Sequence, residues 1–170
     1  MPKDLIFDVN YLGGHMPTFA LNFSRPGSEV IAQYYMFLSL GHAGYRRVMQ
    51  NAQNVAQYLS GEIAKIGPYR LITDGSDLPV FAFTLAPDVE NYTVFDVSDR
   101  IRERGWLIPA YTFPEKRQDL SVLRIVVRTG MNLDLADHLL EHLAEQTEFL
   151  ESLDRPLPAQ STDKRQAFAH

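Results

Sequence analysis

The spacing of the apolar residues changes at Gly67-Pro68, and this change constrains the fold more than any other feature of the sequence. Before it, residues 45–66 carry apolar side chains at intervals of three and four, which is the period of an amphipathic helix. After it come short runs in which apolar residues alternate, as they do in strands. Glycine often ends a helix and proline cannot continue one, so the junction predicts a helix terminus.

Another helical pattern lies before residues 45–66 in the chain. Residues 29–40 have apolar side chains at helical spacing, and Ser28 is a suitable N-cap, followed by Glu29 at the positive end of the helix dipole. The sequence Gly41-His42-Ala43-Gly44 interrupts the pattern. We therefore expect a kink or a joint between two helices at this point.

The second half of the chain predicts an α+β fold, in which an antiparallel sheet is covered by helices on one face. Asn132 is the expected N-cap of the last helix. That helix should bury Leu135, Leu139, Leu143 and Phe149. The strand of residues 106–113 contains Pro109 and should be irregular or at an edge. The expected strands are residues 69–73, 80–85, 106–113 and 121–128, and the expected helices are residues 93–103 and 132–153.

The two ends of the chain differ from this middle part. Near the start, apolar Leu5, Ile6 and Val9, a Gly13-Gly14 turn and a returning strand over residues 18–23 predict a hairpin. From residue 154 onward there are few apolar side chains and no period. We expect a flexible tail there.

Composition excludes several classes of protein. A chain of 170 residues can bury one core. Its net charge of −5 argues against a nucleic-acid partner. It has no cysteine, which excludes a disulfide framework and a thiolate metal site. No apolar run has the length of a signal peptide or a membrane span, so we expect a cytoplasmic protein without a membrane partner.

Arg124 is the strongest candidate for a binding residue. Strand alternation places Leu123, Ile125 and Val127 on one face and Arg124 on the other. An arginine in so apolar a strand stays charged and needs an anionic partner. That partner is either an acidic residue of the same protein or the carboxylate of a substrate. Arg128, nearer the strand end, is interpreted as structural.

The histidines and the first strand-to-helix junction are weaker candidates. His138 and His142 are four residues apart on a helix, the spacing of a two-histidine metal face, but no third ligand follows at a matching distance. An ordinary amphipathic repeat explains them better, and we predict no metal site. At the junction, Ser24 and Arg25 precede the helix start and could bind an anion such as a phosphate.

Several sequence blocks resemble the C-terminal part of bacterial and plant-type glutamate decarboxylases, which are pyridoxal-phosphate enzymes of the aspartate-aminotransferase fold type. The blocks are NYLGG, PTFALNFSRPGSEVIAQYY, RGWLIPAYTFP and LRIVVRTG. The resemblance implies a small C-terminal domain of that fold type, preceded by an interface hairpin and long helices. It implies four parts: residues 1–28 ending the large domain, 29–66 connecting helices, 67–153 the small domain and 154–170 a regulatory tail.

The resemblance also implies roles for individual residues. Arg124 matches the arginine that holds the substrate α-carboxylate. Ser24 matches a residue that contacts the cofactor phosphate across a subunit interface. Phe23 matches a residue that helps to close the pocket around the distal carboxylate. The alternative for Phe23 is simple packing in the core. Tyr11 and Leu12 match the tip of a hairpin that shifts between active and inactive forms.

The end of the chain matches a regulatory element. In the family a tail with a histidine at the position of His170 plugs the active site as pH rises. The family also needs a lysine that forms a Schiff base with the cofactor, in a Ser-x-His-Lys context, and no such motif occurs in this sequence. We therefore expect the chain to be a fragment that has no catalytic residue of its own and is inactive alone.

The expected function of the complete protein is the conversion of L-glutamate to 4-aminobutanoate and carbon dioxide in acid resistance. It would need pyridoxal 5'-phosphate and self-association, with the active site at the interface. Two alternatives stay open: a non-catalytic interaction module with the same fold, and a decarboxylase for another amino acid.

Overall fold

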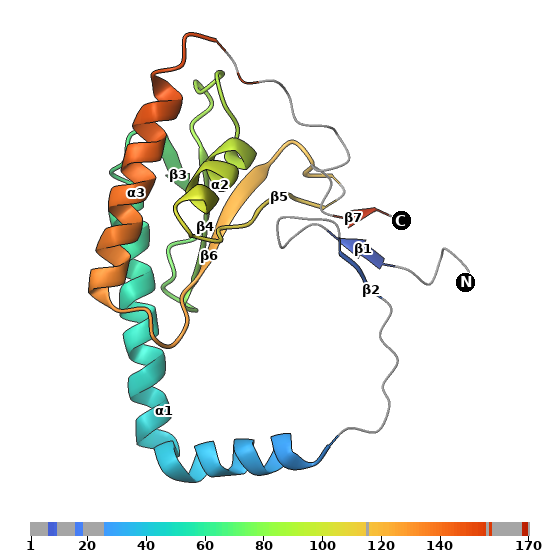
Figure 1. Cartoon of the computed structure of the whole chain (residues 1–170), viewed down its shortest axis with the longest axis vertical. Coiled ribbons are helices and arrows are strands. Elements are labelled where there is room, and N and C mark those ends of the chain that lie inside the picture. Colours follow the sequence, from blue (N-terminus) through green and yellow to red (C-terminus); the bar gives the residue numbers. More distant parts are fainter. Residues whose placement is uncertain are drawn as a thin grey trace.

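The structure is a computed structural model that describes residues 7–9, 16–18, 26–114, 116–155, 157 and 168–169. A long helix leads into a four-stranded sheet that carries two further helices (Figure 1). The predicted α+β class is confirmed.

Helix α1, Ser28–Ile63, is bent at Gly41. Gly41 has φ 55° and ψ −177°, a backbone conformation that side chains with a Cβ rarely adopt. The predicted joint is therefore confirmed. The predicted cap is wrong: Gly27 occupies the N-cap position without a side-chain hydrogen bond, and Ser28 is already helical. The helix also ends earlier than predicted, with Ala64 at the C-cap.

The four-stranded sheet is antiparallel throughout and has the strand order β3-β4-β6-β5. Its strands are β3 Tyr69–Leu71, β4 Val80–Leu85, β5 Ala110–Thr112 and β6 Ser121–Val126. β5 lies at the edge, as predicted, but it has three residues where eight were expected. Pro109 and Pro114 lie on either side of it, and proline cannot donate a hydrogen bond to a sheet.

Helices α2, Val94–Glu103, and α3, Leu133–Glu151, begin at side-chain caps. Thr93 and Asp96 form a capping box at α2. The Asn132 side chain accepts a hydrogen bond from the Leu135 amide at 2.9 Å, which confirms the predicted cap of α3.

The core lies between the helices and one face of the sheet. Leu139 and Leu143 of α3 are buried as predicted. Leu135 and Phe149 are not: their exposed fractions are 42% and 45%. The core consists of Ala52, Val55, Ala56, Leu59 and Ile63 of α1; Tyr69, Phe81, Phe83, Leu123 and Ile125 of the sheet; Val94, Phe95, Val97 and Ile101 of α2; and Ala136, Leu139, Leu143 and Leu150 of α3, with Tyr92, Ile108, Ala110 and Val127.

A second, three-stranded sheet has the order β2-β1-β7. β1, Phe7–Val9, pairs antiparallel with β2, Met16–Thr18, which confirms the predicted strand pair. The predicted Gly13-Gly14 turn lies outside the described residues. The returning strand starts two residues earlier than predicted. β7, Phe168–Ala169, pairs with β1, and the sequence analysis did not predict this strand.

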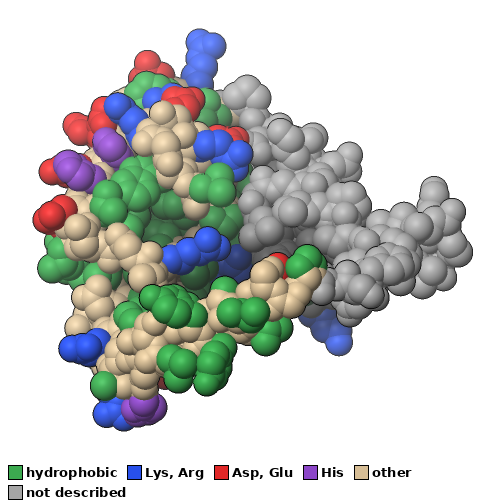
Figure 2. Space-filling model, turned by 60° about the horizontal axis from the view of Figure 1, so that its bottom comes forward, with side chains coloured by type: hydrophobic (Ala, Val, Ile, Leu, Met, Phe, Trp, Pro, Cys, Tyr) green, Lys and Arg blue, Asp and Glu red, His purple; other side chains and the backbone are tan. Residues whose placement is uncertain are grey.

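The first half of α1 forms an exposed apolar arm, which we define as residues 28–40. From Val30 to Leu38 seven large apolar side chains are 45–71% exposed. In Figure 2 the arm projects from the rest of the described chain and carries apolar side chains on its surface. They are Val30, Ile31, Tyr34, Tyr35, Met36, Phe37 and Leu38. Among the helices in the described ranges, none is long and apolar enough to cross a membrane.

Candidate functional site

Arg124 lies in the middle of β6, one of the two central strands of the sheet. It pairs with Ala82 of β4, and its amide donates to the carbonyl of Pro109 at 3.1 Å. Leu123, Ile125 and Val127 are buried against the helices, so the predicted alternation is confirmed. The half-buried Arg124 side chain therefore belongs to the face opposite the helices.

An aromatic ring holds the guanidinium of Arg124. The guanidinium carbon lies 5.4 Å from the centroid of the Tyr111 ring, within the range of a cation–π contact. Tyr111 in turn stacks on Phe113, with 6.4 Å between ring centroids and 14° between ring planes. Tyr111 is not among the predicted site residues, because only the β5–β6 register, in which Tyr111 pairs with Val122, brings its ring to Arg124.

Arg128 follows β6 and is exposed. Together with Arg47 and Asn51 of α1 it lines a depression of about 240 Å³ at the turn into α3. This lining places two guanidinium-bearing side chains around one hollow. The structural role of Arg128 stays a prediction.

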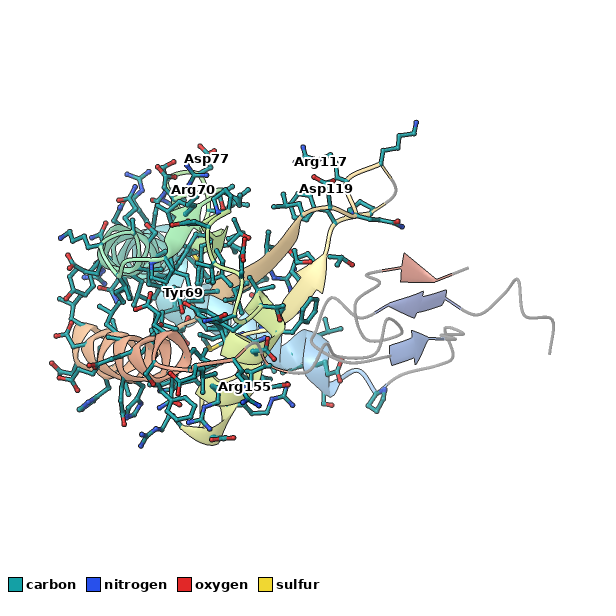
Figure 3. The ribbon with its side chains drawn as sticks, turned by 90° about the horizontal axis from the view of Figure 1, so that it is seen from above. Tyr69, Arg70, Asp77, Arg117, Asp119 and Arg155 are labelled. Atoms are coloured by element: carbon teal, nitrogen blue, oxygen red, sulfur yellow. The ribbon has the colours of Figure 1, made fainter. Side chains whose placement is uncertain are left out.

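A larger hollow of about 420 Å³ lies elsewhere on the sheet. Its lining includes Arg70 of β3, Thr84 of β4 and Asp119, but not Arg124. Figure 3 shows Asp119 beside Arg117 at the far end of the β5–β6 connection. Their Nε and Oδ1 atoms are 3.6 Å apart, and both side chains are largely exposed. A pair so accessible to water is a weak interaction, and we assign no function to this hollow.

The two histidines of α3 have different partners. His142 Nδ1 accepts a hydrogen bond from the Trp106 indole at 2.9 Å. His138 Nδ1 lies 3.4 Å from the carboxylate of Glu141 on the same helix. In the described ranges no group of three histidine, cysteine or acidic side chains is placed to hold a metal ion.

The other predicted site residues lie outside the described residues. They are Tyr11, Leu12, Phe23, Ser24 and His170. Their roles stay predictions that follow from the resemblance. Arg25 of the predicted anion site is outside as well.

Comparison with known proteins identifies the family. The sequence profile of the pyridoxal-dependent decarboxylase conserved domain matches residues 1–86. The chain belongs to this family. It is 52% identical over 149 residues to the glutamate decarboxylase of Aliivibrio fischeri and 40% identical over 153 residues to glutamate decarboxylase 5 of Arabidopsis thaliana. These matches cover 86% and 90% of the chain but only 32% and 31% of the relatives.

One solved structure supports the same assignment, and a more distant one shares the fold. The chain superposes on the Lactobacillus brevis glutamate decarboxylase with a TM-score of 0.75 and 38% identity, over 90% of this chain and 35% of that one. A serine palmitoyltransferase from Sphingomonas wittichii shares the fold at 17% identity, with a TM-score of 0.63. The chain thus spans about a third of the length of the glutamate decarboxylases that it matches.

The family's cofactor, pyridoxal phosphate, can be tested against the described side chains. Lys65 forms an ion pair of 2.7 Å with Glu62 at the end of α1, and Lys116 lies in the β5–β6 connection. Neither lysine belongs to the strands around Arg124. The described residues therefore place no lysine beside Arg124, and Ser24, the residue expected at the cofactor phosphate, lies outside them.

Proposed function

We propose that this chain is the substrate-carboxylate-binding part of a glutamate decarboxylase that converts L-glutamate to 4-aminobutanoate and carbon dioxide. The observation that carries the proposal is Arg124: it lies in a central strand, on the face opposite the helices, with its guanidinium over the Tyr111 ring. The identity of 52% to the Aliivibrio fischeri glutamate decarboxylase supports the choice of substrate.

Arg124 would bind the α-carboxylate of glutamate. Its planar guanidinium can donate two parallel hydrogen bonds to a carboxylate, which fixes both the position and the plane of that group. The central strand and the Tyr111 ring limit the movement of the guanidinium. Arg124 thereby orients the bond between the α-carbon and the carboxylate, a contribution of positioning to the rate.

The remaining roles rest on the resemblance. Bound pyridoxal phosphate supplies the electron sink for the charge left on the α-carbon when carbon dioxide departs. Ser24 would contact its phosphate and Phe23 would close the pocket around the distal carboxylate. One proton is taken up at the former α-carbon in each turnover, so the reaction consumes acid and suits a role in acid resistance.

The same proposal covers the organisation of the protein. Residues 1–28 end the large domain, 29–66 connect it to the small domain of residues 67–153, and 154–170 form a regulatory tail in which His170 acts. Tyr11 and Leu12 lie at the tip of a hairpin that shifts between active and inactive forms. The enzyme is a cytoplasmic homo-oligomer with residues 10–24 at the subunit interface.

A chimera tests the proposal. This chain replaces the matching segment of the Aliivibrio fischeri glutamate decarboxylase, and the release of carbon dioxide and 4-aminobutanoate from L-glutamate is measured at acidic pH. We expect an active chimera and no activity from the 170-residue chain alone. A chimera that folds and shows the absorption of bound pyridoxal phosphate, yet releases no product, would favour the non-catalytic module. Activity confined to another amino acid would favour the third alternative.

A further inference from the structure

The connection between α2 and β5 is attached to α3 by one side-chain hydrogen bond. Trp106 Nε1 donates to His142 Nδ1 at 2.9 Å. Trp106 is half-buried and packs against the core. Gly105, with φ 87°, turns the chain at the end of α2 so that Trp106 meets α3.

The hydrogen bond between Trp106 and His142 depends on which ring nitrogens of His142 carry protons. An indole N–H can only donate a hydrogen bond, so His142 Nδ1 must present a lone pair and the proton of the neutral ring is on Nε2. A second proton on the ring would occupy Nδ1 and turn it into a donor. The indole and the doubly protonated imidazole would then present two N–H groups to each other, and the bond could not exist.

The helices that the contact joins, α2 with its C-terminal end and α3, carry three ion pairs. Arg104, two residues before Trp106, forms an ion pair with Glu145, one turn after His142. The other two pairs, Arg100 with Glu103 and His138 with Glu141, lie within single helices. These groups are Arg100, Glu103, Arg104, His138, Glu141 and Glu145. Each of these groups has an ion-pair partner of its own.

The contact lies next to the candidate site along the chain. Trp106 is followed by the exposed Leu107 and by Ile108, whose carbonyl accepts from Ser98. Next along the chain, the Pro109 carbonyl accepts a hydrogen bond from the Arg124 amide, and the Tyr111 ring lies under the Arg124 guanidinium. A change at Trp106 therefore acts on the segment that supports Arg124 from the edge of the sheet.

We infer that the Trp106–His142 hydrogen bond is a pH-sensitive anchor of the segment leading into β5. The anchor is closed when the imidazole is neutral and open when both ring nitrogens carry protons. This inference does not depend on the proposed enzymatic function, since both partners belong to the described chain.

The experiment follows the indole N–H of the 170-residue chain, which contains a single tryptophan. Its NMR signal, and its hydrogen-exchange protection relative to a tryptophan peptide at the same pH, are measured from about pH 5 to 8. We expect one step in both readouts. Protection should fall by about fivefold on the acid side, the factor that corresponds to the loss of one net hydrogen bond.

Two variants of the same helix give the control. His142→Asn puts an amide oxygen where Nδ1 lies, so it keeps the acceptor without a titrating group, and protection should stay high at every pH. His138→Asn makes the same replacement one turn earlier and should leave the step unchanged. A wild-type chain without the step, a step that persists in His142→Asn, or its loss in His138→Asn would overturn the inference.

Discussion

Two buried tyrosines differ in what the side-chain hydroxyl contributes to the stability of the fold. Tyr69 and Tyr92 are 4% and 5% exposed. The Tyr69 hydroxyl shares a hydrogen bond of 2.7 Å with the Thr147 hydroxyl, and Thr147 donates to the Leu143 carbonyl. No described residue gives the Tyr92 hydroxyl a partner. The two hydroxyls should therefore affect stability in opposite directions.

Replacing each tyrosine by phenylalanine tests this difference. Tyr92→Phe removes a buried group without a partner and should raise the free energy of unfolding by about 1 kcal/mol. Tyr69→Phe breaks a buried hydrogen bond and should lower it by about 1 kcal/mol. Urea unfolding of the three proteins measures both changes. Shifts of the same sign in the two variants would contradict the assignment.

The same residues predict a loss of stability in alkali. Burial, with a further contribution from the charge of Glu151, raises the pKa of Tyr92 from 10.0 to about 12. Burial raises the pKa of Tyr69 even further, against the opposing effect of its hydrogen bond with Thr147. The folded state thus holds protons that the unfolded chain releases from about pH 10 upward.

This stabilisation is present below pH 10 and is lost as pH rises towards the folded pKa. Unfolding titrations at pH 9, 10 and 11 should show a decline in stability that becomes smaller in Tyr92→Phe. An equal decline in wild type and variant would show that Tyr92 does not contribute.

Arg124 and Tyr111 show what residue patterns can and cannot predict. Alternation along one strand was enough to place Arg124 on the face opposite the core. The ring of Tyr111 reaches Arg124 only through the pairing of two strands. The period of a single segment carries no information about such a contact.

At the scale of elements, apolar spacing predicted which segments are helices and strands better than it predicted their buried faces. Helix α3 buries Gln146 and Thr147 in place of Phe149. Both polar side chains make hydrogen bonds, to Arg100 and to Tyr69, so their burial costs little. Phe149 stays near the surface with the Arg100 guanidinium 4.3 Å from its ring centroid. Hydrophobicity alone could not predict this exchange.

The short strand β7 bears on the proposed regulatory tail. Its residues, Phe168 and Ala169, pair with β1, which also pairs with β2. In the active chimera, deletion of residues 168–170 removes this strand together with His170, whose imidazole would ordinarily lose its charge near pH ~6.5. The truncated enzyme should stay active closer to neutral pH, with an unchanged rate in acid.

The pH profile of activity measures this effect. Deletion of residues 159–161 from the same tail, which leaves Phe168 to His170 in place, is the matched control and should behave as the intact chimera does. If all three proteins lose activity along one curve, the tail has no regulatory role.

At the scale of the whole molecule, the arm of residues 28–40 is the part whose large apolar side chains are left exposed by the rest of the described chain. Residues 30–45 contain no charged side chain, and a helix that is apolar on all sides is normally buried. An exposed apolar surface of this kind leads to association. The isolated chain should therefore form oligomers whose mass in sedimentation velocity grows with concentration.

Charges on the arm should reverse this association. The double variant Tyr34→Lys and Phe37→Lys should sediment as a monomer, because both side chains are exposed in the described chain and their replacement leaves the core intact. Tyr58→Lys, a charge on the second half of α1, is the control and should associate as the wild type does. A wild-type chain that stays monomeric at all concentrations would contradict the expectation.

The central claim, that Arg124 binds the substrate carboxylate, is tested most directly by the kinetics of the chimera. Arg124→Lys keeps the charge but loses the planar pair of donors, so kcat/KM for L-glutamate should fall by about tenfold or more. Arg128→Lys makes the same exchange at an exposed position after the same strand and should remain near the unsubstituted chimera. If Arg124→Lys retains the full kcat/KM, or if both variants lose the same fraction of it, Arg124 is a structural cation and the account is wrong.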